Sequence, residues 1–98
     1  MNINIQAPWH VYKHLQNHIY NQLNKLTKYT GQGWHADVFL KTKANHFPED
    51  KVIQVRLRLP GKELFAEAHA DLFEKAISHA TDKIKTQLLK RKAELQQH

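Results

Sequence analysis

The sequence predicts an α+β fold in which a four-stranded mixed sheet carries two helices on one face, in the order β-α-β-β-β-α. Four short segments alternate apolar and polar residues with a period of two, which is typical of strands with one buried face. Two longer segments repeat apolar residues every three or four positions, as a helix with one apolar stripe does. No segment has the composition of a linker, so residues 1–98 are expected to form a single domain.

The N-terminal part predicts a strand followed by a helix. Residues 2–7 alternate isoleucines with amide side chains, and Pro8 ends this strand and suits the start of a helix. A helix is then expected from about Trp9 to Lys28, with Gly31 marking its end. Its apolar stripe, at steps of four, four, four and three, is Val11, Leu15, Ile19, Leu23 and Leu26.

Three further strands are predicted over residues 34–42, 51–59 and 62–69, each with alternating apolar and polar positions. The polar segment 43–50 has the composition of a hairpin loop, and the Pro-Gly pair at 60–61 predicts a turn. The strand-helix-strand connection favours a right-handed crossover between parallel strands, and the other strands pair as antiparallel hairpins.

A second helix is expected to begin near Asp71, which suits an N-cap. Its apolar stripe is Phe73, Ala76, Ile77, Ala80, Ile84 and Leu88. Both stripes must be buried against one face of the sheet, which leaves the other face open to solvent. The residues expected on that open face include Phe39, Lys41, Gln54, Arg56 and Arg58.

Composition argues against several classes of function. The chain has no cysteine, which removes disulfides, thiolate metal sites and cysteine nucleophiles. It has no apolar run of the ~20 residues that a membrane span needs, and its N-terminus lacks signal-peptide features, so we expect a cytoplasmic protein with no membrane partner. Carboxylates are scattered and no glycine-rich phosphate loop occurs, so we expect neither an enzyme nor a cofactor.

The charge distribution points to a polyanionic partner. The formal net charge is +6, and five basic residues but no acidic ones lie between Lys83 and Lys92. Lysines in a last helical turn complement the helix dipole, but that accounts for only one or two of them. If the two helices run side by side in parallel, Lys25 and Lys28 join this cluster and form one phosphate-binding surface.

Two other groups of residues have alternative interpretations. His10, His14 and His18 are four apart on the first predicted helix and could chelate a metal ion, although a solvated polar face is the favoured interpretation. Phe39 and Phe65 could stack on bases if they lie on an open sheet face, but cross-strand packing is favoured.

Several short motifs occur in a fixed order along the chain: Lys25-Leu26 with Tyr29, residues 64–68, residues 71–77, Asp82-Lys83-Ile84, Gln87-Leu88 and Lys90-Arg91-Lys92. Taken together in this order, they resemble the ribosome hibernation promoting factor family, which is also called the sigma-54 modulation or ribosome-associated inhibitor family. Ser78 departs from the family, because members usually have aspartate there.

The resemblance implies binding to the small ribosomal subunit and its rRNA in the mRNA/tRNA channel, with inhibition of translation under stress or in stationary phase. Residues that match by position are Lys25, Lys83, Gln87, Lys90, Arg91 and Lys92. The distribution of charge adds Lys28, Lys75, Lys85, Arg56 and Arg58. Because the chain stops at His98, we expect a short form without a C-terminal dimerisation domain, monomeric off the ribosome. Whether a second hibernation factor is a partner stays open.

Two alternatives to this function remain. A double-stranded RNA-binding module has a similar core, but it needs a lysine-rich N-terminus on its last helix, whereas here that helix begins Asp71-Leu72-Phe73-Glu74. A protein-interaction domain that uses the open face or an edge strand is the other alternative, and insensitivity of binding to salt would favour it.

Overall fold

The computed structural model describes residues 2–31, 33–45 and 47–96, with side chains as far as Lys90. The elements in chain order are β1 (Asn2–Gln6), α1 (Lys13–Asn24), α2 (Thr27–Thr30), β2 (His35–Thr42), β3 (Lys51–Leu59), β4 (Lys62–Ala70) and α3 (Phe73–Gln96). The strands form one sheet in the order β1-β2-β3-β4, in which β1 and β2 are parallel and the other pairs antiparallel. The predicted fold class is therefore confirmed, with the short α2 as an addition.

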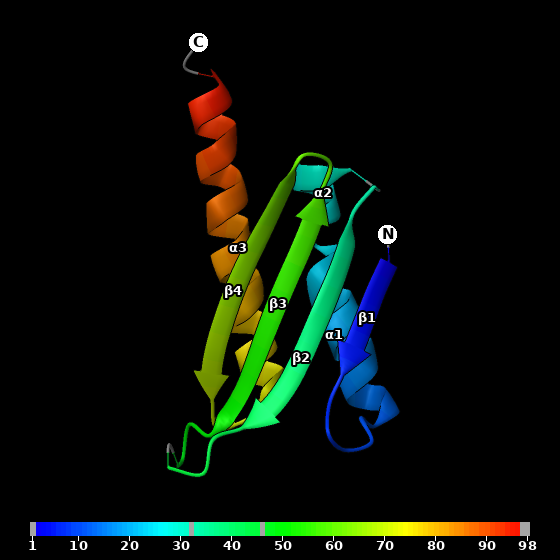
Figure 1. Cartoon of the computed structure of the whole chain (residues 1–98), viewed down its shortest axis with the longest axis vertical. Helices are drawn as coiled ribbons and strands as arrows, with labels where there is room; N and C mark the ends of the chain where they lie inside the picture. Colours follow the sequence, from blue (N-terminus) through cyan, green and yellow to red (C-terminus); the bar gives the residue numbers. More distant parts are fainter. Residues whose placement is uncertain (1, 32, 46, 97–98) are drawn as a thin grey trace.

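The two long helices lie on one face of the sheet and run in the same direction (Figure 1). The parallel β1-β2 pair requires α1 to return antiparallel to β1, and the β3-β4 hairpin brings the chain back to the end where α1 began. As a result, α3 starts beside the start of α1, and α2 lies near the β3-β4 turn (Figure 1), where its Tyr29 meets Lys85 in the middle of α3. This parallel arrangement brings the basic ends of both helices to one end of the molecule.

The core lies between the sheet and the helices, where the predicted apolar stripes are buried. Leu15, Ile19 and Leu23 of α1, and Ile77 and Ile84 of α3, are all at most 1% exposed. Burying each such side chain contributes about 1.5–3 kcal/mol. The inward rows of the strands that complete this cluster are Ala36, Val38 and Leu40, then Ile53, Val55 and Leu57, then Leu64, Ala66, Ala68 and Ala70.

The first helix differs from the prediction at both ends. It begins at Lys13 rather than near Trp9, because Trp9 packs on the Phe73 ring with 5.6 Å between centroids and Val11 is buried in the core. Tertiary packing thus keeps this segment out of the helix, against a periodicity that favoured one. The helix also ends at Asn24, where the Leu26 N–H donates to the Leu23 carbonyl at 2.9 Å, three residues back, and breaks the regular ladder.

The prediction of Asp71 as the N-cap of the last helix is wrong. The helix α3 begins at Phe73, so the capping position falls on Leu72, whose carbonyl accepts from the Ala76 N–H at 3.0 Å. The Asp71 carboxylate lies 3.1 Å from the Lys75 ammonium instead. Among the described residues, no helix has the length and apolar composition that crossing a membrane requires.

Candidate nucleic-acid interface

Three lysines converge where the ends of α1 and α2 meet α3. Lys25 follows α1, Lys28 lies in α2 and Lys85 lies in α3, and all three line one hollow of about 230 Å³. The side chains of Lys28 and Lys85 both approach the Tyr29 ring, with their ammonium nitrogens 5.3 and 5.9 Å from its centroid. We call this surface, formed by Lys25, Lys28, Tyr29 and Lys85, the basic notch.

The basic notch keeps an excess of positive charge. No ion pair among the described residues involves its three lysines, although Asp82 also lines the hollow. The face of an aromatic ring attracts cations, so Tyr29 favours positions that hold two ammonium groups near each other in spite of their repulsion. Ammonium groups gathered in this way suit the oxygens of a phosphate as point-charge partners.

Lys83 and Gln87 lie on the opposite flank of α3, against the exposed edge of β4. The Lys83 Nζ donates to the Glu67 carbonyl at 2.6 Å, and the Gln87 Nε2 donates to the Phe65 carbonyl at 2.9 Å. Two side chains from the helix thus satisfy carbonyls that an edge strand would otherwise present to water or to another chain. These two residues, which match the family by position, therefore have a structural role separate from the basic notch.

Replacing Lys83 and Gln87 together with alanine is expected to lower the free energy of unfolding by about 1–2 kcal/mol, because two hydrogen bonds to β4 are lost. Urea unfolding followed by circular dichroism would measure the change. The matched control is the pair Lys85→Ala and Lys90→Ala, which removes exposed side chains of α3 that, within the described part of the chain, donate to no carbonyl of β4. Equal stability of both variants would contradict the role of Lys83 and Gln87.

The remaining residues of the predicted set fall in three places. Lys90 is exposed on α3, whereas the side chains of Arg91 and Lys92 lie outside the described residues. Lys75 lies in the first turns of α3, far from the basic notch, and pairs with Asp71. The structure therefore separates Lys75 from the cluster that charge counting assigned it to.

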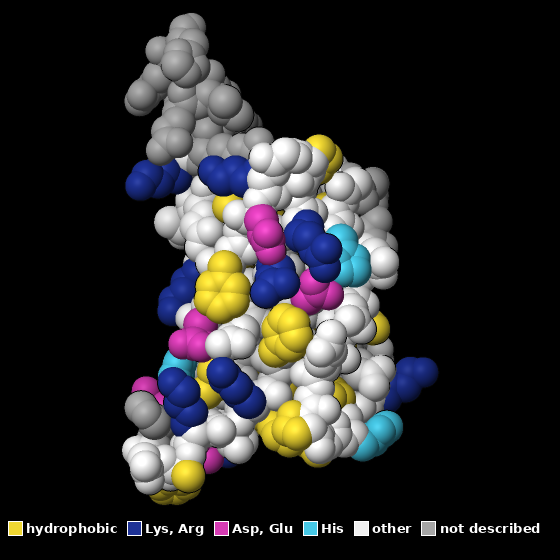
Figure 2. All heavy atoms as spheres, viewed as in Figure 1, with side chains coloured by type: hydrophobic (Ala, Val, Ile, Leu, Met, Phe, Trp, Pro, Cys, Tyr) yellow, Lys and Arg dark blue, Asp and Glu magenta, His cyan; other side chains and the backbone are white. Residues whose placement is uncertain are grey.

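Arg56 and Arg58 lie on the open face of the sheet, the face opposite the helices, and each meets a carboxylate. The Arg58 Nη2 lies 2.6 Å from the Asp37 Oδ2, and the Arg56 Nε lies 3.1 Å from the Glu63 Oε1. Figure 2 shows basic and acidic side chains intermixed across the middle of this face. These arginines are therefore largely compensated, whereas the lysines of the basic notch have no ion pair among the described residues.

Asp37 is buried under its partners, since its side chain is 8% exposed. The hydrogen bond from Arg58, with a second contact to the His35 Nε2 at 3.0 Å, lowers the pKa of the Asp37 carboxyl below its usual value, although burial opposes the shift. A carboxyl whose pKa is lower in the folded state stabilises the fold above its unfolded pKa of about 3.9. That stabilisation is lost as the pH falls through the folded pKa.

We therefore expect Asp37→Asn to destabilise the protein by about 1–2 kcal/mol near pH 7, because a charge-assisted bond becomes a neutral one. The difference between variant and wild type should shrink as the pH falls below about 4. Urea unfolding at a series of pH values would measure it. A gap that stays constant down to pH of about 2 would contradict the coupling between Asp37 and Arg58.

The three histidines do not share one helical face. His10 precedes α1, so its predicted place on the helix is wrong. The His14 ring stacks on that of Tyr12, and the His18 Nε2 lies 3.3 Å from the Glu74 carbonyl oxygen. Within residues 2–31, 33–45 and 47–96, no group of three histidine, aspartate or glutamate side chains is placed to hold a metal ion.

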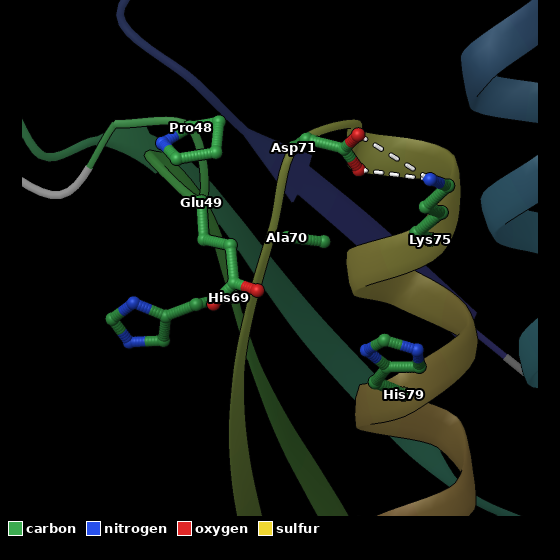
Figure 3. Close-up of a pocket in the computed structure, with 7 residues that line it drawn as sticks. All are labelled: Pro48, Glu49, His69, Ala70, Asp71, Lys75 and His79. Atoms are coloured by element: carbon green, nitrogen blue, oxygen red, sulfur yellow. Dashed lines mark hydrogen bonds and ion pairs between the residues drawn. The ribbon is translucent and has the colours of Figure 1, made fainter.

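A second hollow, of about 310 Å³, lies at the end of the molecule opposite the basic notch. Figure 3 shows Lys75 of α3 turned toward Asp71, with His69 on the strand and His79 on the helix. Glu49 is a second carboxylate in its lining. Since two carboxylates accompany the single lysine, this hollow does not offer the uncompensated positive charge of the basic notch.

Comparisons with known proteins agree with the fold. Residues 3–96 match the family model described as sigma 54 modulation protein / S30EA ribosomal protein. A ribosome hibernation promoting factor of Acinetobacter guillouiae is 52% identical over 48 residues, which make up 49% of this chain and 38% of that protein. The match therefore spans well under half of the length of that relative.

Two solved structures have a similar fold. A ribosomal subunit interface protein from Coxiella burnetii has a TM-score of 0.78 at 19% identity, covering 95% of this chain and 99% of that one. The N-terminal domain of Thermus thermophilus Protein Y has a TM-score of 0.73 at 18% identity, covering 89% of this chain and 91% of that one. At such identities the likeness concerns the fold alone.

Proposed function

Because the chain belongs to the sigma 54 modulation protein / S30EA ribosomal protein family, we propose that it is a ribosome hibernation factor that inhibits translation. In this proposal it binds rRNA of the small subunit in the channel for mRNA and tRNA, and so acts in the cytoplasm. The observation that carries the proposal is the basic notch, where Lys25, Lys28 and Lys85 converge without ion pairs among the described residues.

The chemistry of the basic notch suits a phosphate backbone. Its lysines come from three helical segments, so they present charge along a curved surface rather than along a single helix. Lysine ammonium groups contact phosphate oxygens without reading base edges, so recognition depends on the shape of the RNA. Binding of this kind releases counterions and weakens steeply as the salt concentration rises.

The double-stranded RNA-binding alternative finds less support in the geometry. That module uses a lysine-rich N-terminus on its last helix. Here the corresponding end of α3 carries Glu74, and Lys75 is paired with Asp71. The unpaired lysines of the basic notch lie beside the middle of α3 instead, so the ribosomal proposal is preferred. No step of it involves chemical turnover.

Sedimentation of the purified protein with bacterial ribosomes through sucrose tests the proposal. We expect comigration with the small subunit and the whole ribosome but not with the large subunit, and a steep loss between about 50 and 200 mM salt. Comigration with the large subunit alone, or binding that is insensitive to salt, would contradict the proposal. The same gradients show whether ribosomes pair in the presence of the protein.

A further inference from the structure

A third hollow, of about 340 Å³, lies on the open face of the sheet, where the chain leaves β1. It is lined by residues 6–8 from the end of β1 onward, by residues 39–41 of β2, which include Phe39 and Lys41, and by Gln54 of β3. Figure 2 shows hydrophobic side chains in the middle and lower parts of this face, with basic and acidic side chains beside them. The hollow therefore combines aromatic and amide groups with a nearby cation.

The strand register sets the arrangement of this hollow. Gln6 of β1, Phe39 of β2 and Gln54 of β3 are direct partners across three adjacent strands. Neighbouring strands lie about 4.8 Å apart, so the two glutamines stand on either side of the phenyl ring, at backbone positions roughly 10 Å from each other. The Phe39 side chain is half-buried and so fixed at its base, with part of the ring open to solvent.

Gln54 is held in one orientation. Its Nε2 donates to the Glu67 Oε1 at 2.7 Å, and among the described residues its Oε1 accepts no hydrogen bond. The amide therefore keeps an acceptor for an incoming donor. Lys41, two residues beyond Phe39 on the same side of β2, has no ion pair within the described parts of the chain. A flat apolar ring, two flanking amides and an unpaired cation thus surround one hollow.

We propose that this hollow binds an unpaired nucleobase of RNA, stacked on Phe39, with its edge contacted by Gln6 and Gln54 and its phosphate by Lys41. Single-stranded RNA is recognised in this way, through stacking on aromatic rings and hydrogen bonds to exposed base edges. The proposal rests on the proposed function for the source of the RNA. It adds a base-contacting site on the face of the sheet opposite the helices.

The composition of the hollow favours a nucleobase over an apolar peptide segment. An apolar side chain would bury the Gln54 Oε1, which accepts no hydrogen bond among the described residues, without giving it a donor, and this costs free energy. A nucleobase carries both donors and acceptors on its edge and an apolar face for the ring. Its phosphate also gives a partner to Lys41, which a neutral peptide would not.

Binding of fluorescein-labelled hexamers of adenosine, uridine and cytidine, followed by anisotropy at low salt, tests this site. Phe39→Leu is expected to weaken binding of the hexamers by about fivefold to thirtyfold, because stacking on the ring is lost. Phe39→Tyr, which keeps the ring, should bind within about twofold of the wild type. The matched control is Phe65→Leu, since Phe65 is 51% exposed on the same face but outside the hollow.

Several results would overturn the proposal. Equal hexamer affinity of Phe39→Leu and Phe65→Leu, with both variants folded by circular dichroism, would exclude stacking at Phe39. Displacement of a hexamer by an apolar peptide but not by a second hexamer would assign the hollow to a protein partner. Adenosine monophosphate that binds as tightly as the adenosine hexamer would assign it to a free nucleotide rather than to RNA.

The experiment also separates this site from the proposed function. If wild-type protein sediments with the small subunit but hexamer binding does not depend on Phe39, the nucleobase site is wrong and the basic notch stands. If hexamer binding depends on Phe39 but no ribosome binding occurs at any salt concentration, the proposed function is wrong and the nucleobase site stands.

Discussion

Reversing the three lysines of the basic notch, by Lys25→Glu, Lys28→Glu and Lys85→Glu together, is expected to abolish comigration with the small ribosomal subunit. Each phosphate contact of a lysine raises affinity about eightfold near 0.1 M salt through counterion release, so losing three lowers it about 500-fold before any repulsion is added. Sedimentation at several salt concentrations measures the affinity, and the salt slope of any residual binding should fall by about three.

A control of equal charge is available at the other end of the molecule. Lys13→Glu, Lys43→Glu and Lys75→Glu also remove six units from the formal net charge of +6. These lysines belong to the start of α1, the loop after β2 and the first turns of α3, where the figure places the opposite end of the fold (Figure 1). If both triple variants lose binding equally, net charge rather than the basic notch determines affinity.

Reversal of Lys83 and Lys90 to glutamate is a less direct test of RNA binding than reversal in the basic notch. Lys83 donates to the Glu67 carbonyl, so a carboxylate at position 83 would remove that bond and face an oxygen. Loss of binding by that variant would therefore mix a change of charge with a change at the β4 edge.

The strands were predictable because each has one buried face. In β3, the positions that alternate toward the helices are close to fully buried, whereas Arg56 and Arg58 between them are exposed. The period of two therefore fixed both the extent of this strand and the face it buries. The burial of Val52 does not follow from this period. Ile53 points toward the helices, so its neighbour Val52 is expected on the exposed face, yet Val52 is fully buried.

The first helix was harder to predict, because the apolar period continues beyond it. Val11 has the correct spacing from Leu15 and is buried, yet it lies before α1. Burial is set here by the contact between Trp9 and Phe73, which are 64 residues apart in sequence. The apolar period of residues 11–26 cannot reveal a contact with a residue so far away in the sequence. The start of α1 is therefore set by tertiary packing, which the period does not predict.

The candidate site was predictable in its helices but not on the sheet. Sequence spacing and the crossover rule together bring Lys25, Lys28 and Lys85 close to one another, because α1 and α3 start side by side and run in parallel, so that the end of α1 lies level with the middle of α3. Arg56 and Arg58 have the same charge but lie across from carboxylates, and the partners Asp37 and Glu63 come from two different strands. The register of the strands decides which arginine meets which carboxylate. The amino-acid composition does not specify that register.

The largest expected effect on stability is at Ile84, which anchors the basic half of α3. Its side chain is fully buried, and its sequence neighbours Lys83 and Lys85 lie on opposite flanks of the helix. Ile84→Ala removes buried methyl groups and leaves a cavity, so the free energy of unfolding should fall by about 2–4 kcal/mol. For a domain of this size that lowers Tm by about 10–25 °C, which thermal unfolding by circular dichroism measures.

Leu89→Ala is the matched control, because Leu89 lies in the same helix and loses similar apolar atoms but is 43% exposed. Its Tm should fall by only a few degrees, since surface substitutions usually change stability by about 0.5 kcal/mol or less. Equal losses for both variants would mean that α3 is not packed through Ile84.

At a temperature where Ile84→Ala is still folded, its ribosome affinity should match that of the wild type. In the proposed function, the basic notch binds phosphate only when α3 is docked on the sheet, so a smaller side chain at position 84 affects binding only through that docking.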